Sequence, residues 1–181
     1  MHLRTYYPTV VLSDIHLGTS HSKTIEVSNF LKSVNCDRLI LNGDIIDGWH
    51  LRKAGTKKWQ AKHTDFFKVI MKMMENFGTE VIYVRGNHDG NYDRRPPEGC
   101  DCIEDKLVVF NGLRIAGLGG SRLYSGGKNQ YSEREMKNRI WKLGWKIRRA
   151  GGVDIVLTHA PARGFGDAED FAHCGFEAFL P

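Results

Sequence analysis

Two hydrophobic patterns alternate along the first half of the chain, and this alternation restricts the fold more than any other feature. Short aliphatic runs with the length and composition of buried strands recur at 9–13, 38–42 and 80–85. Between them, 22–34 and 64–77 carry apolar residues at helical spacing, and Gly78 stands where a C-capping glycine is expected. This β-α-β-α-β order predicts a parallel sheet with right-handed crossovers and flanking helices. The residues predicted to face the core are Val27, Phe30, Leu31 and Val34 in the first helix, and Phe66, Ile70, Met73, Met74 and Phe77 in the second.

The second half of the chain has a different pattern. Apolar runs on both sides of Asn111-Gly112 predict a hairpin with a type I′ turn. Ser132 and Glu135 form a capping-box pattern for a helix near 132–149, and 153–158 has the composition of another strand. At 181 residues the chain suits a single domain, 1–181, with a loop-rich seam between the halves near 90–99.

Composition narrows the class of protein. A hydrophobic content of 41% supports a substantial core, and the net charge of +5 favours anionic partners such as phosphate esters, nucleic acid or an acidic membrane face. The Lys and Arg residues are dispersed and lack interleaved aromatics, which argues against nucleic acid. The four cysteines form no CxxC pair, no apolar run reaches the ~20 residues of a membrane span, and the N-terminus lacks a signal-peptide core. A cytoplasmic location is therefore expected, while the oligomeric state is not indicated.

Polar residues follow four of the predicted strands. They occur in the segments SDIHLG, NGDIIDG, RGNHDG and THAPARG, which contain Asp14, His16, Asp44, Asp47, Asn87, His88, Asp89, His159 and Arg163. In open α/β sheets, ligands bind beyond the carboxyl ends of the strands, so these side chains are expected to converge.

Carboxylate, amide and imidazole donors without a thiol suit a borderline divalent metal such as Mn, Fe or Zn. In Asp14-x-His16, alternate side chains of an extended segment would point the same way, and both would reach one ion. Asp44 has two oxygens with which to bridge two ions. Taken singly, Asp14 would be a turn residue, Asp47 a helix N-cap and His159 a buried core histidine. Their joint occurrence after successive strands favours the metal site.

These motifs, over residues 9–163, resemble those of the calcineurin-like metallophosphoesterase family. The resemblance implies an α/β sandwich of two mixed sheets flanked by helices, with two divalent metal ions. It implies that Asp14 and His16 hold the first ion, that Asp44 bridges, and that Asn87 and His159 hold the second. By the same resemblance, His88 lies at the scissile phosphate as general acid or charge stabiliser, Asp47 orients it, and a bridging hydroxide attacks in line. Arg163, in the same segment as His159, is the candidate substrate-binding residue.

Two branches of the family contribute to the resemblance. Residues 9–89 are most similar to UDP-2,3-diacylglucosamine pyrophosphatases, in SDIHLGTSHSKT and NGDIIDGWHL, whereas residues 91–179 resemble small general bacterial metallophosphoesterases. The family's closing Gly-His-x-His motif does not follow His159, so a C-terminally incomplete domain is expected. The expected function is hydrolysis of a phosphomonoester, phosphodiester or pyrophosphate. The alternative is a weakly active or inactive metal-binding scaffold.

The substrate expectation covers phosphate-containing small molecules and lipid-linked nucleotides. Trp49, Leu51 and Trp59, with the Lys and Arg residues between 52 and 62, fit a peripheral contact with the inner face of the membrane. An ordinary loop leading into the helix at 64–77 fits the same residues.

Overall fold

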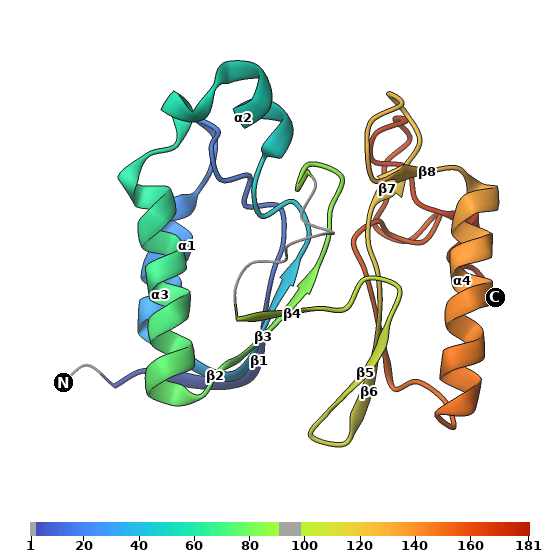
Figure 1. The fold of residues 1–181 in the computed structure, drawn as a ribbon, viewed down its shortest axis with the longest axis horizontal. Helices are drawn as coiled ribbons and strands as arrows, with labels where there is room; N and C mark the ends of the chain where they lie inside the picture. Colours follow the sequence, from blue (N-terminus) through green and yellow to red (C-terminus); the bar gives the residue numbers. More distant parts are fainter. Residues whose placement is uncertain (1–2, 91–98) are drawn as a thin grey trace. The chain divides into compact units, whose positions relative to one another are not determined.

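The computed structural model describes residues 3–90 and 99–181, which fold as two compact units (Figure 1). Unit 1 contains residues 1–82 and 88–101, and unit 2 contains residues 83–87 and 102–181. The predicted seam near 90–99 falls mostly on residues 91–98, which lie outside the described residues. The single domain over 1–181 stays a prediction.

Unit 1 is built on a sheet in which the strand order is β1-β2-β3-β4. Its elements are β1 (Thr5–Leu12), α1 (Thr24–Ser33), β2 (Val34–Asn42), α2 (Gly48–Ala54), the 3-10 helix η1 (Thr56–Lys58), α3 (Ala61–Phe77), β3 (Glu80–Val84) and β4 (Cys100–Cys102). Strands β1 and β2 pair in parallel, from Thr5 opposite Val34 to Leu12 opposite Leu41. The helices α1 and α3 lie side by side against the sheet (Figure 1). The predicted β-α-β-α-β order is therefore confirmed.

The core of unit 1 lies between this helix pair and the sheet. Leu31, Phe66 and Met73 are fully or almost fully buried, as predicted, and Gly78 ends α3 with a φ of 66° in the left-handed region. Two predicted core residues are wrong, because Phe30 is 41% and Phe77 42% exposed. The buried stripe of α1 runs instead through Thr24, Ser28 and Leu31, which turns Phe30 to the outside.

Unit 2 has a mixed sheet in the order β5-β6-β9 and a short two-stranded sheet. Its elements are β5 (Leu107–Phe110), β6 (Leu113–Leu118), β7 (Ser121–Arg122), β8 (Gln130–Tyr131), α4 (Glu133–Arg149), β9 (Ile155–Thr158) and the 3-10 helix η2 (Glu177–Phe179). Strands β5 and β6 are antiparallel, while β6 and β9 are parallel. Asn111 and Gly112 have φ of 48° and 82°, so the predicted type I′ turn is confirmed.

Helix α4 supplies much of the core of unit 2. Met136 and Leu143 are buried against Leu118 and Phe176. The helix begins at the predicted capping box, in which Ser132 and Glu135 exchange side-chain and backbone hydrogen bonds. The predicted α/β class, with parallel and mixed sheets flanked by helices, is confirmed. None of the helices in residues 3–90 and 99–181 combines the length and the apolar run needed to cross a bilayer.

Candidate metal centre

The loops that follow β1 and β2 remain paired beyond the ends of their strands. The Asp14 N–H donates to the Gly43 carbonyl at 3.1 Å, and the His16 N–H donates to the Asp44 carbonyl at 2.9 Å. In the opposite direction, the Asp47 N–H donates to the Leu17 carbonyl at 3.0 Å. Because the two parallel strands end at the same edge, this pairing places the polar residues of one loop beside those of the other.

A third loop, after β3, is fastened to the second by Asp89. This carboxylate is 1% exposed and accepts the backbone N–H groups of Asp44 at 2.7 Å and Ile46 at 2.9 Å. In return, Asp44 Oδ1 accepts the His88 N–H at 2.8 Å. The sequence motifs assign no role to Asp89, although its position next to His88 at the end of a strand could have indicated that it belongs to the site. Asp89 sets the shape of the turn that carries Asp44.

Gly48 allows the second and third loops to approach closely. Its N–H donates to the His88 carbonyl at 2.8 Å, and a Cβ at this position would lie 3.0 Å from the same carbonyl oxygen. A side chain at position 48 would therefore force the backbone of the two loops apart at His88 by a few tenths of an ångström.

Three of the proposed metal ligands have a backbone conformation that L-residues rarely adopt. Asp14, His16 and Asp44 have φ of 53°, 50° and 52°. The extended Asp-x-His segment expected from the sequence is therefore wrong: the side chains converge because both residues are in left-handed turns. Such strain persists only where the surrounding structure enforces it, and it concentrates at functional sites.

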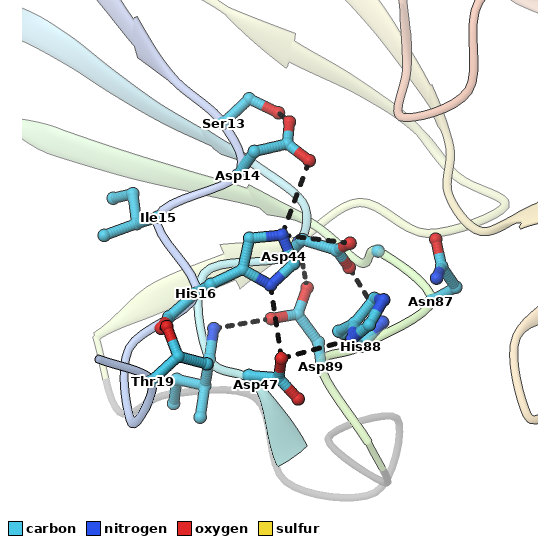
Figure 2. A network of polar contacts seen from close by, with 12 residues as sticks. Ser13, Asp14, Ile15, His16, Thr19, Asp44, Asp47, Asn87, His88 and Asp89 are labelled. Carbon is cyan, nitrogen blue, oxygen red and sulfur yellow. Dashed lines mark hydrogen bonds and ion pairs between the residues drawn. The ribbon is translucent and has the colours of Figure 1, made fainter. Parts of the chain in front are cut away.

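Around His16, the donor atoms are spaced as the ligands of one metal ion would be (Figure 2). His16 Nε2 lies 3.9 Å from Asp14 Oδ1 and 3.8 Å from Asp44 Oδ2. Metal–ligand distances of about 2.1 Å allow donor atoms about 3–4 Å apart on one ion. Ser13 Oγ donates to the second oxygen of Asp14, which fixes the carboxylate. Oxygen and imidazole donors in this arrangement fit a divalent metal.

Asp47 faces the imidazoles of both His16 and His88, and it contacts the His16 ring on the side opposite Asp14 (Figure 2). Its Oδ2 is 3.5 Å from His16 Nδ1 and 3.3 Å from His88 Nδ1, and its Oδ1 caps α2 by accepting the His50 N–H at 2.7 Å. The cap and the histidine contact, which the sequence presented as alternatives, thus coexist on separate oxygens. The three side chains of His16, Asp47 and His88 form a compact group with donor atoms within 4.8 Å of one another. Carboxylates that contact the remote nitrogen of a ligating histidine orient that ligand.

The charge of Asp47 changes the protonation of both histidines. Its carboxylate raises the pKa of His16 and of His88, although burial alone would lower both. Burial would raise the pKa of Asp47, but the contacts with His16 and His88 outweigh it and lower that pKa. A raised histidine pKa stabilises the fold fully below about pH 6.5, and this contribution is lost as the pH rises through the folded-state pKa. The lowered pKa of Asp47 contributes above about pH 4 and is lost as the pH falls further.

The remaining predicted site residues, Asn87, His159 and Arg163, belong to unit 2. Asn87 Nδ2 donates to the Tyr124 hydroxyl at 3.2 Å, and the His159 N–H donates to the Leu118 carbonyl at 3.2 Å beyond the end of β9. Arg163 donates to the sulfur of Cys174. Unit 1 thus brings together Asp14, His16, Asp44, Asp47 and His88, and the convergence of Asn87, His159 and Arg163 with them stays a prediction.

Comparison with known proteins identifies the family. The family model for calcineurin-like phosphoesterases matches residues 7–177, whereas no curated protein matches the chain. A crystal structure of the Pseudomonas putida nuclease MPE is similar at 18% identity and a TM-score of 0.38, covering 67% of this chain and 60% of the nuclease. The matched family consists of phosphoester hydrolases that depend on a dinuclear metal centre, in agreement with the predicted enzyme class. With a match over almost its whole length, this chain belongs to the calcineurin-like phosphoesterase family.

Proposed function

We propose that this chain hydrolyses phosphate esters or anhydrides at the carboxyl ends of β1, β2 and β3. The observation that carries the proposal is the cluster of Asp14, His16 and Asp44, three residues in left-handed turns whose donor atoms face one another at 3.8–3.9 Å. Backbone strain at three potential ligands is difficult to explain by stability alone, because each strained residue costs about 1–3 kcal/mol.

Asp14 and His16 would hold the first divalent ion, Asp44 would bridge, and Asn87 and His159 would hold the second. When bound, such ions lower the pKa of water and neutralise the charge of the phosphoryl group. We propose Mn, Fe or Zn because the donor set mixes carboxylate oxygens and imidazoles without thiolates. Asp44, which is 4% exposed and fixed by the His88 N–H, is suited to keep both carboxylate oxygens in place.

His88 is the proposed general acid. The Asp47 carboxylate faces its Nδ1 and raises its pKa, which favours the protonated imidazole. Nε2 is then left to donate that proton to the leaving oxygen or to stabilise the phosphoryl oxygens. Trp49 packs against the ring at a centroid distance of 4.9 Å and limits its rotation. Asp47 is accordingly a positioning residue, whereas Arg163 is a proposed phosphate ligand.

The proposals for the substrate and for a membrane contact rest on the resemblance to one branch of the family. The likeness of residues 9–89 to UDP-2,3-diacylglucosamine pyrophosphatases supports a lipid-linked nucleotide as one substrate. That substrate would go with a peripheral contact at the cytoplasmic face of the membrane. The contact would use Trp49 and Trp59, and vesicle sedimentation without bound protein would exclude it. The dispersed Lys and Arg residues, which lack interleaved aromatics, favour these substrates over nucleic acid.

The test is hydrolysis of p-nitrophenyl phosphate by the Mn²⁺-loaded protein. We expect turnover that EDTA abolishes, and a fall in kcat of about 10²–10⁴-fold in His88→Gln, as for loss of a general acid. His173→Gln is the matched control, because that imidazole is 76% exposed and pairs with Asp170. The control should retain the parent rate.

Calorimetric titration with Mn²⁺ separates the alternatives. Metal binding without turnover of monoester, diester or anhydride substrates would favour the catalytically inactive scaffold over the hydrolase. Absence of metal binding would contradict both.

A further inference from the structure

A pocket of about 490 Å³ opens beside the metal cluster in unit 1. Asp14, His16 and Asp47 form one wall, and the loop after β1 with the first turn of α1 forms the rest. Pockets of this size hold small organic ligands. A phosphoryl group at the cluster would therefore have its next substituent at the entrance of this pocket.

The hydroxyl groups that line the pocket form hydrogen bonds with backbone carbonyls of the surrounding loops. Ser22 Oγ donates to the Ile15 carbonyl at 2.7 Å, and Thr19 Oγ1 donates to the His16 carbonyl at 3.0 Å. Ser13 Oγ shares its single proton between Asp14 Oδ2 and the Asn42 carbonyl, which lies at 2.9 Å. These contacts hold the left-handed turns in place, so the three hydroxyls are structural.

Unlike these hydroxyl groups, the side chains of Lys23 and His21 are not used to hold the loop. Both line the pocket, and neither side chain has a hydrogen bond or ion pair within the described part of the chain. Lys23 is also the N-cap residue of α1, which has no side-chain cap, so the positive end of the helix dipole lies at the same place. Val27 and the buried Ile15 complete an apolar wall.

Charge is distributed unevenly over this pocket. The carboxylates of Asp14 and Asp47 are at the cluster, while the Lys23 ammonium and the His21 N–H belong to the segment that leads into α1. A bound divalent ion would neutralise the first group and leave the second free to attract an anion. The pocket would then have a place for a phosphoryl group at the ion and another for a further negative charge.

We propose that this pocket binds a second anionic group of the substrate, with Lys23 as its main contact and His21 as a further donor. The preferred substrate class is then a phosphoanhydride or bisphosphate rather than a simple monoester. This inference rests on the proposed function for the position of the first phosphoryl group.

The experiment measures binding, so that it does not depend on turnover. Isothermal titration calorimetry at a fixed free Mn²⁺ concentration compares the non-hydrolysable phosphonate analogue of AMP with α,β-methylene-ADP, which has one more phosphoryl group and cannot be hydrolysed at the bridge. We expect tighter binding of the diphosphate analogue, and a loss of about tenfold of this preference in Lys23→Gln, the size of one charge-assisted hydrogen bond. Lys23→Arg should keep the preference. The matched control is Lys72→Gln, an exposed lysine on α3 that should leave the preference unchanged.

An equal preference in Lys23→Gln and the parent protein would overturn the inference, as would an equal loss in Lys72→Gln. If circular dichroism shows that Lys23→Gln is unfolded, His21→Asn takes its place, with an expected loss of about threefold for a neutral donor. Failure of the proposed function gives a different result: no monoester, diester or anhydride substrate would be hydrolysed, whichever nucleotide the protein binds.

Discussion

Replacing Asp89 by Asn tests whether one buried carboxylate sets the geometry of the metal centre. In the parent protein this carboxylate accepts two backbone N–H groups, from Asp44 and Ile46. Two hydrogen bonds to a charged acceptor are worth about 1.5–3 kcal/mol each, and an Asn oxygen retains one neutral bond of about 1 kcal/mol. The amide NH₂ faces the other N–H group and leaves it unsatisfied. We therefore expect the turn at 43–46 to be destabilised by about 3 kcal/mol.

Amide hydrogen exchange measures this loss at the two donors. The exchange of the Asp44 and Ile46 amides should accelerate by a factor on the order of 100, the equivalent of 3 kcal/mol in a local opening equilibrium. Mn²⁺ affinity should fall with it, because Asp44 is then no longer preorganised. Asp65→Asn is the control: its carboxylate is 58% exposed and pairs with Lys68 on the surface of α3. Acceleration below about fivefold at both amides would refute the role assigned to Asp89.

Three further predictions concern the site and its support. Because the pKa of His16 is raised, and metal ligation needs the neutral imidazole, Mn²⁺ affinity should fall as the pH is lowered from about 8 to about 6. An affinity that does not change over this range in calorimetry would contradict this. Gly48→Ala should reduce turnover at least tenfold by displacing His88, with Gly144→Ala in α4 as the control, because a Cβ there has no neighbour within 4 Å and the backbone is helical. Met136→Ala should destabilise unit 2 by about 2–5 kcal/mol in urea unfolding, since Met136 is fully buried, and a loss under about 1 kcal/mol would count against that packing.

Much of the fold follows from local pattern. The capping box at Ser132, the left-handed Gly78 and the Asn111-Gly112 turn were predictable because each is set by a few neighbouring residues. The inward face of α1 was not, because a helix with several apolar residues can bury more than one stripe. Its packing against α3 decides the choice and leaves Phe30 exposed.

The chemistry of the site can be read from the motifs alone: they place carboxylates and imidazoles after successive strands, in the pattern of one family. How these groups meet depends on the fold. Asp14 and His16 converge through left-handed turns, which depend on backbone hydrogen bonds to the neighbouring loop and not on residue spacing. Asp47 caps α2 and faces two histidines at once, because residues far apart in sequence approach its separate oxygens. Asp89 acquires its role only when β2 and β3 end at the same edge, which no local pattern encodes.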